Sequence, residues 1–212
     1  LVKKSQIATV SGFSKASLIS KFNLTSDDIL VLPNGIYFEN SFSDKKTSAQ
    51  SPYILAVGSH SPRKGLGQLI KAFSKAELPN VNLYIVGSCS HHFADIEKLN
   101  NDRVKWLENI NDETLCSLYK GCELVVQPSL YEGFGLPILE GLFFKKRVLA
   151  NDLAVFRELF GNSIDYTNTL DIELFSRDLS DAYNANNDTC KSIPEHLSFD
   201  NSANKLIQNI NN

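Results

Sequence analysis

Two carboxylates, Glu132 and Glu140, stand on either side of a glycine-containing turn. The apolar run at 124–126 precedes this turn, and a helix pattern opens at Leu136, so the segment predicts a strand, a loop and a helix start. Glu132 falls in the loop and Glu140 about one turn into the helix, so both can face one crevice. Carboxylates accept hydrogen bonds, and their natural partners beside an anion site are hydroxyls, as on a ribose or a hexose.

Two glycines, Gly133 and Gly135, lie between these carboxylates. Glycine lets the backbone come close to a ligand, and the free N–H groups of a new helix, at the positive end of its dipole, suit an anion. The alternative is that both glutamates only stabilise a helix N-terminus, by about 0.3–1 kcal/mol each. The segment by itself is compatible with a ligand site and with a helix cap.

Two adjacent cations, Arg63 and Lys64, precede a second predicted helix and follow Gly58, which ends an apolar run. Cations at a helix start oppose the helix dipole, at a cost of up to about 1 kcal/mol. A negative group should therefore lie nearby. A diphosphate between this helix start and the one at Leu136 would serve, with Arg63 gripping it in bidentate fashion and Lys64 acting as a point charge. The alternative is a solvated pair of cations on a loop.

Apolar runs and helical stripes alternate along the chain from Tyr53 onward. Continuous apolar strands between helices predict an α/β fold, a doubly wound parallel sheet covered on both faces, in which ligands bind at the carboxyl ends of the strands. Gly87 ends one such strand and permits close approach of a base or a sugar. The predicted strands span 53–57, 81–86, 104–107, 123–127, 147–150 and 163–166. The predicted helices span 65–76, 93–100, 112–120, 136–144, 155–160, 171–185 and 198–210.

The nine residues 132–140, Glu-Gly-Phe-Gly-Leu-Pro-Ile-Leu-Glu, resemble the two-glutamate donor motif of the retaining glycosyltransferases of family 4. Residues 63–65, Arg-Lys-Gly, are similar to the phosphate-binding segment of that family. The resemblance covers nearly the whole chain, from Val10 to Ile210. It implies that the Rossmann-like, doubly wound domain is the C-terminal half of a GT-B fold.

The activity that this resemblance implies is transfer of a sugar from a nucleotide-diphosphate donor to an acceptor hydroxyl, with retention at the anomeric carbon. It implies no cofactor and no obligatory metal. Departure of a nucleoside diphosphate places negative charge on a phosphate oxygen, which Arg63, Lys64 and helix N–H groups can stabilise without a metal cation. By the same resemblance the catalytic residues are Glu132, Arg63 and Lys64.

The resemblance also assigns the donor-binding residues. Glu132 would hold hydroxyls of the donor sugar, and Glu140 those of the ribose. The remaining positions are Gly58, Arg63, Lys64, Gly87, Ile110, Gly133, Phe134, Gly135 and Leu136. Ile110 follows a strand end where the family holds the nucleobase through backbone contacts. The chain departs from the family pattern at Cys89, where a second glycine is usual, and in the basic turn 145–147.

The resemblance divides the chain into four parts. Residues 1–22 would be a remnant of an N-terminal acceptor domain, 23–51 a connecting segment, and 52–195 the donor-binding domain. Residues 196–212 would form a helix that crosses back to the N-terminal domain. The acceptor, a sugar or a lipid-linked saccharide, would bind through the missing domain. We therefore expect the 212 residues to bind a nucleoside diphosphate with little transferase activity of their own.

Composition excludes some other classes of function. A net charge of −3 gives no overall attraction to nucleic acid, and no apolar run approaches the roughly 20 residues that span a bilayer. The cysteines show no metal spacing and predict reduced, mostly buried thiols, and a metal site at His91-His92 lacks further ligands. We expect a cytoplasmic protein, with peripheral association at the inner face of the membrane left open. The cysteines are Cys89, Cys116, Cys122 and Cys190.

Three alternatives remain beside a bacterial enzyme of surface-polysaccharide or O-antigen synthesis. A GT-B enzyme that epimerises or hydrolyses a nucleotide sugar would differ in its N-terminal half. A dinucleotide-dependent oxidoreductase would need Gly-x-Gly-x-x-Gly after its first strand, and the residues after Gly58 lack it. The third is a non-catalytic module that binds a nucleotide sugar.

Overall fold

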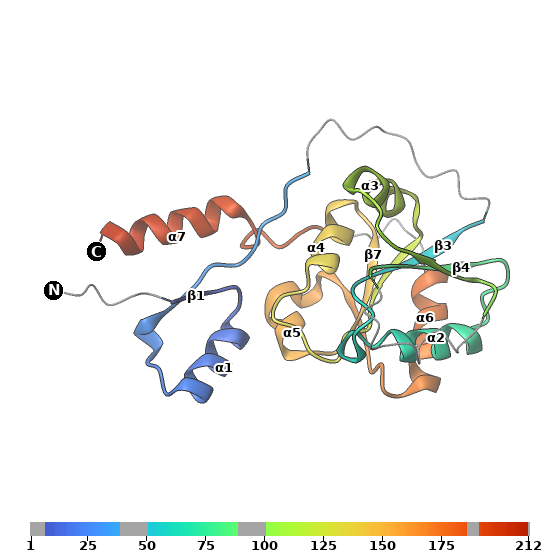
Figure 1. Ribbon diagram of the computed structural model, residues 1–212, viewed down its shortest axis with the longest axis horizontal. Helices are drawn as coiled ribbons and strands as arrows, with labels where there is room; N and C mark the ends of the chain where they lie inside the picture. Colours follow the sequence, from blue (N-terminus) through green and yellow to red (C-terminus); the bar gives the residue numbers. More distant parts are fainter. Residues whose placement is uncertain (1–6, 39–50, 89–100, 186–190, 212) are drawn as a thin grey trace.

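The computed structural model describes residues 7–38, 51–88, 101–185 and 191–211, and within them a six-stranded parallel sheet forms the core of the larger body of the molecule (Figure 1). The strand order is β5-β4-β3-β6-β7-β8, and every neighbouring pair is parallel. The order reverses between β3 and β6, whose carboxyl ends therefore meet at the topological switch point of the sheet. The strands are β3 (Tyr53–Val57), β4 (Asn82–Val86), β5 (Val104–Leu107), β6 (Leu124–Gln127), β7 (Arg147–Asn151) and β8 (Asp165–Thr167).

Helices cover both faces of this sheet, which explains why its strands are apolar along their whole length. Ile54 and Ala56 of β3 belong to a core cluster with α2 and α6, whereas Tyr53 and Leu55 point into the opposite cluster, with α3, α4 and α5. The predicted doubly wound class is confirmed. The helices are α2 (Leu66–Lys75), α3 (Asp112–Gly121), α4 (Leu136–Phe143), α5 (Ala154–Phe160) and α6 (Ile172–Asn184).

A smaller parallel unit precedes the sheet and lies beside α5 (Figure 1). It consists of β1 (Ile7–Thr9), α1 (Gly12–Phe22), the 3-10 turn η1 (Ser26–Asp28) and β2 (Ile29–Val31). The Glu158 carboxylate of α5 accepts hydrogen bonds from the first two N–H groups of α1, at Gly12 (2.6 Å) and Phe13 (2.8 Å). Because β1 pairs with β2, the unit continues past residue 22, where the sequence suggested a boundary.

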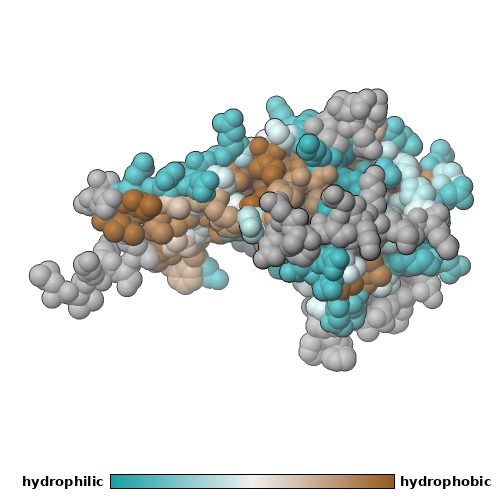
Figure 2. All heavy atoms as spheres, turned by 90° about the horizontal axis from the view of Figure 1, so that it is seen from above, coloured by the Kyte–Doolittle hydropathy of each residue, from teal (hydrophilic) through white to brown (hydrophobic). Residues whose placement is uncertain are grey.

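The last helix, α7 (Phe199–Asn211), lies on the same side as this unit, and the Ser202 hydroxyl donates to the Pro33 carbonyl (2.5 Å). Its apolar residues stay exposed, with Phe199 54% and Ile210 70% accessible, and Figure 2 shows them as a brown surface along the helix. The described part of the chain therefore leaves this face uncovered. None of the described helices combines the length and apolarity needed to cross a bilayer.

Most predicted element bounds agree with the structure to within two residues. The last strand begins at Asp165 instead of residue 163, because Gly161–Ser163 forms the 3-10 helix η4. Cys116 and Cys122 are buried free thiols, as predicted. The predicted helix 93–100 lies outside the described residues, as do Cys89, the histidine pair and Cys190.

Candidate functional site

The Arg-Lys segment and the loop before α4 meet at the switch point of the sheet. Arg63 and Lys64 lie in the 3-10 helix η2 (Pro62–Lys64) after β3, and the loop follows β6. The Leu130 N–H donates to the Arg63 carbonyl (2.7 Å), which joins the two segments through their backbones. The Lys64 ammonium forms a direct ion pair with Glu132 Oε1, and Arg63 Nη1 lies 3.6 Å from Glu132 Oε2. The segments that lead into the two helices predicted to flank a diphosphate are therefore adjacent.

Glu132 sits in a polar network and is only 9% exposed. Besides Lys64, its Oε1 accepts hydrogen bonds from Ser129 Oγ (2.9 Å) and Gln127 Nε2 (3.2 Å). Neither Gln127 nor Ser129 was predicted as a site residue, although they lie only five and three residues before Glu132. The negative group that the cation pair requires is supplied by Glu132 within the chain. The cations by themselves therefore do not demand a bound ligand, which corrects that step of the sequence argument.

The loop enters α4 through Gly135, whose φ of +108° favours glycine. A Cβ there would also lie 2.7 Å from Cε1 of Phe156. The Phe134 ring is buried and packs edge-on to Phe160, so only its backbone can reach a ligand. Within the described residues, the backbone N–H groups of 133–136 donate to no other group. These N–H groups are thus available to an anion at the start of α4.

The N-terminal unit also contacts this loop, which the sequence analysis did not predict. The hydroxyl of the buried residue Ser11 donates to the Gly133 carbonyl (2.8 Å), and Ser14 Oγ lies 3.4 Å from the same oxygen. Ser11 is also the N-cap of α1, because its Oγ accepts from the Ser14 N–H. The start of α1 therefore fixes one peptide of the loop in place.

Glu140 lies in α4 in quite different surroundings. Its Oε2 accepts a hydrogen bond from the hydroxyl of Tyr119, at 2.5 Å, and no cation pairs with it among the described residues. Burial raises the pKa of Glu140, the Tyr119 hydrogen bond opposes that rise, and the charge of Asp112 adds to it. Burial, followed by the charge of Glu140, raises the pKa of Tyr119 well above its usual value. Tyr119 therefore acts as a neutral donor to a partly buried carboxylate.

The other candidate residues follow the neighbouring strands at the same edge of the sheet. Gly58 comes after β3, and its N–H donates to the Val86 carbonyl (2.8 Å). A Cβ on Gly87 would lie 2.0 Å from the Gly58 carbonyl oxygen. Packing of one strand end against the next therefore accounts for the glycine at 87, where the sequence analysis invoked close approach of a ligand. Ile110 follows β5 and packs partly buried against the core.

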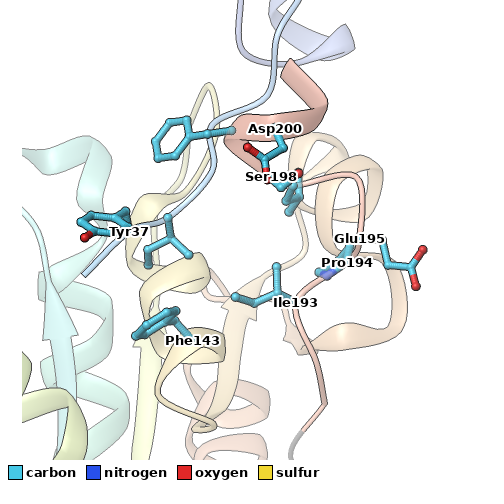
Figure 3. A pocket seen from close by; sticks show the side chains of 10 residues that line it. Tyr37, Phe143, Ile193, Pro194, Glu195, Ser198 and Asp200 are labelled. Carbon is cyan, nitrogen blue, oxygen red and sulfur yellow. The ribbon is translucent and has the colours of Figure 1, made fainter. Parts of the chain in front are cut away.

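An apolar pocket of about 430 Å³ lies elsewhere, between the segment at Ile36 and Tyr37, the C-terminal end of α4 at Phe143, and residues 193–200 (Figure 3). It contains none of the candidate donor-binding residues. Within the described residues no group of three His, Cys, Asp or Glu side chains could hold a metal ion. Metal-independent chemistry remains a prediction.

Comparison with known proteins gives a family match over most of the chain. The sequence profile of the family described as Glycosyl transferases group 1 matches residues 38–189. The serotype-specific mannosyltransferase WbdA of Escherichia coli is 35% identical over 149 residues, which cover 66% of this chain and 18% of WbdA. The O-antigen chain mannosyltransferase RfbU of Salmonella typhimurium strain LT2 is 30% identical over 167 residues, which cover 76% of this chain and 46% of RfbU. The chain thus spans less than half the length of either relative.

The fold also has counterparts among solved structures. Sucrose-phosphate synthase from Thermosynechococcus elongatus superposes with a TM-score of 0.76 at 18% identity, over 96% of this chain and 57% of that one. At this level of identity the likeness concerns the fold alone. The predicted relationship to the GT-B fold is confirmed.

Proposed function

The chain belongs to the Glycosyl transferases group 1 family, and from that premise we propose that it is the donor-binding part of a retaining glycosyltransferase of the family 4 type. The enzyme would transfer a sugar from a nucleoside-diphosphate donor to an acceptor hydroxyl. The observation that carries this proposal is the meeting of Arg63 and Lys64 with the loop before α4 at the switch point of the sheet. Open α/β sheets bind their ligands in that position.

The charges around Glu132 suit a diphosphate that replaces Glu132 as a partner of Arg63 or Lys64. In the unliganded protein Glu132 balances Lys64 and, at longer range, Arg63. The Arg63 side chain is half exposed, so its guanidinium can turn to an incoming phosphate, and the unused N–H groups of 133–136 supply further donors. When the bond between the anomeric carbon and the phosphate oxygen breaks, these groups would stabilise the charge on the leaving diphosphate. The acceptor oxygen would form the new bond to the anomeric carbon, and its proton would pass to an oxygen of the leaving diphosphate.

Glu132 would then serve the donor sugar, and Glu140 the ribose. An ionised carboxylate accepts hydrogen bonds but donates none, so each can receive a hydrogen bond from a sugar hydroxyl but repels a phosphate. Gly58, Gly87 and Ile110 follow the neighbouring strands β3, β4 and β5 and would border the rest of the donor. We propose that neither a cofactor nor an obligatory metal takes part.

The names of two relatives support a proposal for the sugar and the setting. WbdA and RfbU are mannosyltransferases, one named as serotype-specific and the other for the O-antigen chain. We propose mannosyl transfer to a growing bacterial surface polysaccharide, in the cytoplasm, with the acceptor bound by a part of the protein outside these 212 residues. The 212 residues alone would bind the donor without transferring its sugar.

Calorimetric titration with nucleoside diphosphates and nucleoside-diphosphate mannoses tests this proposal. We expect binding of at least one of them, and at least a tenfold loss of affinity in Lys64→Gln. The matched control is Lys75→Gln, in α2, whose side chain pairs with Glu173 on the surface and should leave affinity unchanged. Absence of binding at millimolar concentration, or equal effects of both substitutions, would overturn the proposal.

A further inference from the structure

The hydroxyl of Tyr119 is the hydrogen-bond donor that holds Glu140. Tyr119 is completely buried, and a buried tyrosine hydroxyl normally finds a partner. Tyr53, which is equally inaccessible, gives its hydroxyl to a backbone carbonyl, at Leu118 (2.8 Å). Tyr119 instead gives its hydroxyl to a side-chain carboxylate on the neighbouring helix, at 2.5 Å from Oε2 of Glu140. The contact is short, as expected for an O–H donor and a carboxylate.

The direction of this hydroxyl is fixed by packing. The Tyr119 ring stacks on Phe144 just after α4, with centroids 5.6 Å apart and planes 12° apart. The hydrogen bond from Tyr53 to Leu118 anchors the backbone next to Tyr119. The other end of α3 is capped by Asn111, whose side chain accepts from the Thr114 N–H. Tyr119 therefore presents its hydroxyl from a capped helix that begins two residues after Ile110, in the segment that follows β5.

The hydrogen bond from Tyr119 to Oε2 of Glu140 also fixes the direction of the other carboxylate oxygen, Oε1. Oε1 of Glu140 accepts no hydrogen bond from any described residue, and the side chain is partly accessible to solvent. A free glutamate would rotate about its terminal torsion, and that freedom would be lost again when a ligand binds. With Oε2 held by Tyr119, the orientation of Oε1 is set before the ligand arrives.

Building on the proposed function, we propose that Tyr119 is a positioning residue that aims the free oxygen of Glu140 at the ribose hydroxyls of the donor. Tyr119 thereby makes the site selective for ribonucleotides. A site that holds a hydroxyl through an oriented, partly buried acceptor rejects analogues that lack the hydroxyl, because the acceptor is then left unpaired. A pair that served only to join α3 to α4 would have no effect on that selectivity.

The test measures ribose selectivity by calorimetry with a nucleoside diphosphate that binds and with its 2′-deoxy and 3′-deoxy analogues. We expect the protein to favour the ribonucleotide by at least about tenfold, the size of one charge-assisted hydrogen bond. Tyr119→Phe keeps the stacked ring and should lower the ribonucleotide affinity by about tenfold while leaving that of one deoxy analogue unchanged. Tyr53→Phe is the control. It removes an equally buried hydroxyl that donates to the same helix, α3, at the Leu118 carbonyl, and it should leave the ribose selectivity unchanged.

Glu140→Gln provides a second route to the same answer. Tyr119 would still donate to the amide oxygen, so an amide nitrogen would face the ribose and selectivity should fall to the same extent. The double variant should lose no more than either single one, because both substitutions remove one interaction. Undiminished selectivity in Tyr119→Phe, or absence of ribose selectivity in the unaltered protein, overturns the role of Tyr119. Absence of any nucleoside-diphosphate binding overturns the proposed function itself.

Discussion

Glu132 and Glu140 belong to one short segment, yet their carboxylates have opposite surroundings. Glu132 lies in the loop after β6, and two cations, a serine hydroxyl and a side-chain amide contact its oxygens. Glu140 lies one turn into α4 with a single neutral donor, and burial raises its pKa. The two environments differ because the loop faces the Arg-Lys segment after β3, whereas the helix faces α3.

This difference separates two ways of preparing an acceptor for a hydroxyl. At Glu132 the charge is balanced in advance, and a ligand would have to rearrange an ion-pair network. At Glu140 the charge is not balanced, and the tyrosine fixes only its direction. We therefore expect substitutions at the first site to act mainly through charge, and substitutions at the second to act through orientation and pH.

The largest effect is expected for Glu132→Gln in the whole enzyme. The substitution keeps the shape but removes the charge that holds Lys64, and we expect turnover to fall by about 100-fold through misplacement of the donor. Steady-state kinetics with a nucleotide-sugar donor measures it. Glu173→Gln, which removes the partner of Lys75 on the surface, is the control and should leave turnover unchanged.

Glu132→Ala tests the same ion pair through the stability of the protein. The side chains of Glu132 and Lys64 are nearly inaccessible, so removing the whole Glu132 side chain should also lower the free energy of unfolding, by about 3 kcal/mol, because Lys64 is left unpaired. Thermal denaturation measures this loss. If Glu132 were only a helix cap, Glu132→Gln would lower stability and turnover in proportion, and the contrast between the two carboxylates would disappear.

A somewhat smaller effect is expected for Gly135→Ala, in the turn that separates the two environments. The φ of +108° is strained for alanine, and the new methyl group would contact the Phe156 ring. We expect a loss of about 1–3 kcal/mol in the free energy of unfolding, measured with urea. Gly67→Ala, in α2, is the control, because a Cβ there meets no atom within 4 Å. An equal loss in both variants would show that the turn is not constrained.

The smallest effect is the pH dependence of stability that Glu140 produces. Burial raises its pKa above the ordinary value of 4.5, so the folded protein retains this proton at pH values where the unfolded chain has lost it. The contribution of Glu140 to the free energy of unfolding therefore falls as pH rises from 4.5 through the folded pKa. Glu140→Gln lacks this titration. Its stability relative to the unaltered protein should be greater at pH 7 than at pH 4.

Urea denaturation of Glu140→Gln and of the unaltered protein at a series of pH values measures this difference in stability. The contributions of the other titrating groups largely cancel, because both proteins contain them. Tyr119→Phe removes a hydrogen bond that favours the carboxylate, so in that variant the fall in stability should extend to higher pH. A constant difference between Glu140→Gln and the unaltered protein at all pH values would show that Glu140 titrates normally.

Much of the fold could be predicted from the sequence, because the local pattern of apolar and polar residues determines where the strands and helices form. Apolar runs such as 124–126 are too short to form amphipathic helices, and the spacing of the apolar residues in α2 predicts which face of that helix is buried. The motif after β6 and the cation pair after β3 could both be found in the sequence, because each is a run of neighbouring residues. Right-handed crossovers in a doubly wound sheet then place those two strand ends side by side.

The partners of the charged groups were decided only by the tertiary structure. No spacing in the sequence relates Lys64 to Glu132, Tyr119 to Glu140, or Ser11 to Gly133, since each pair joins separate elements. Such contacts depend on strand register and on the rotation of each helix about its axis, and a shift of about one residue would break them. The sequence therefore determined which residues could do chemistry, and packing determined which of their charges are already balanced.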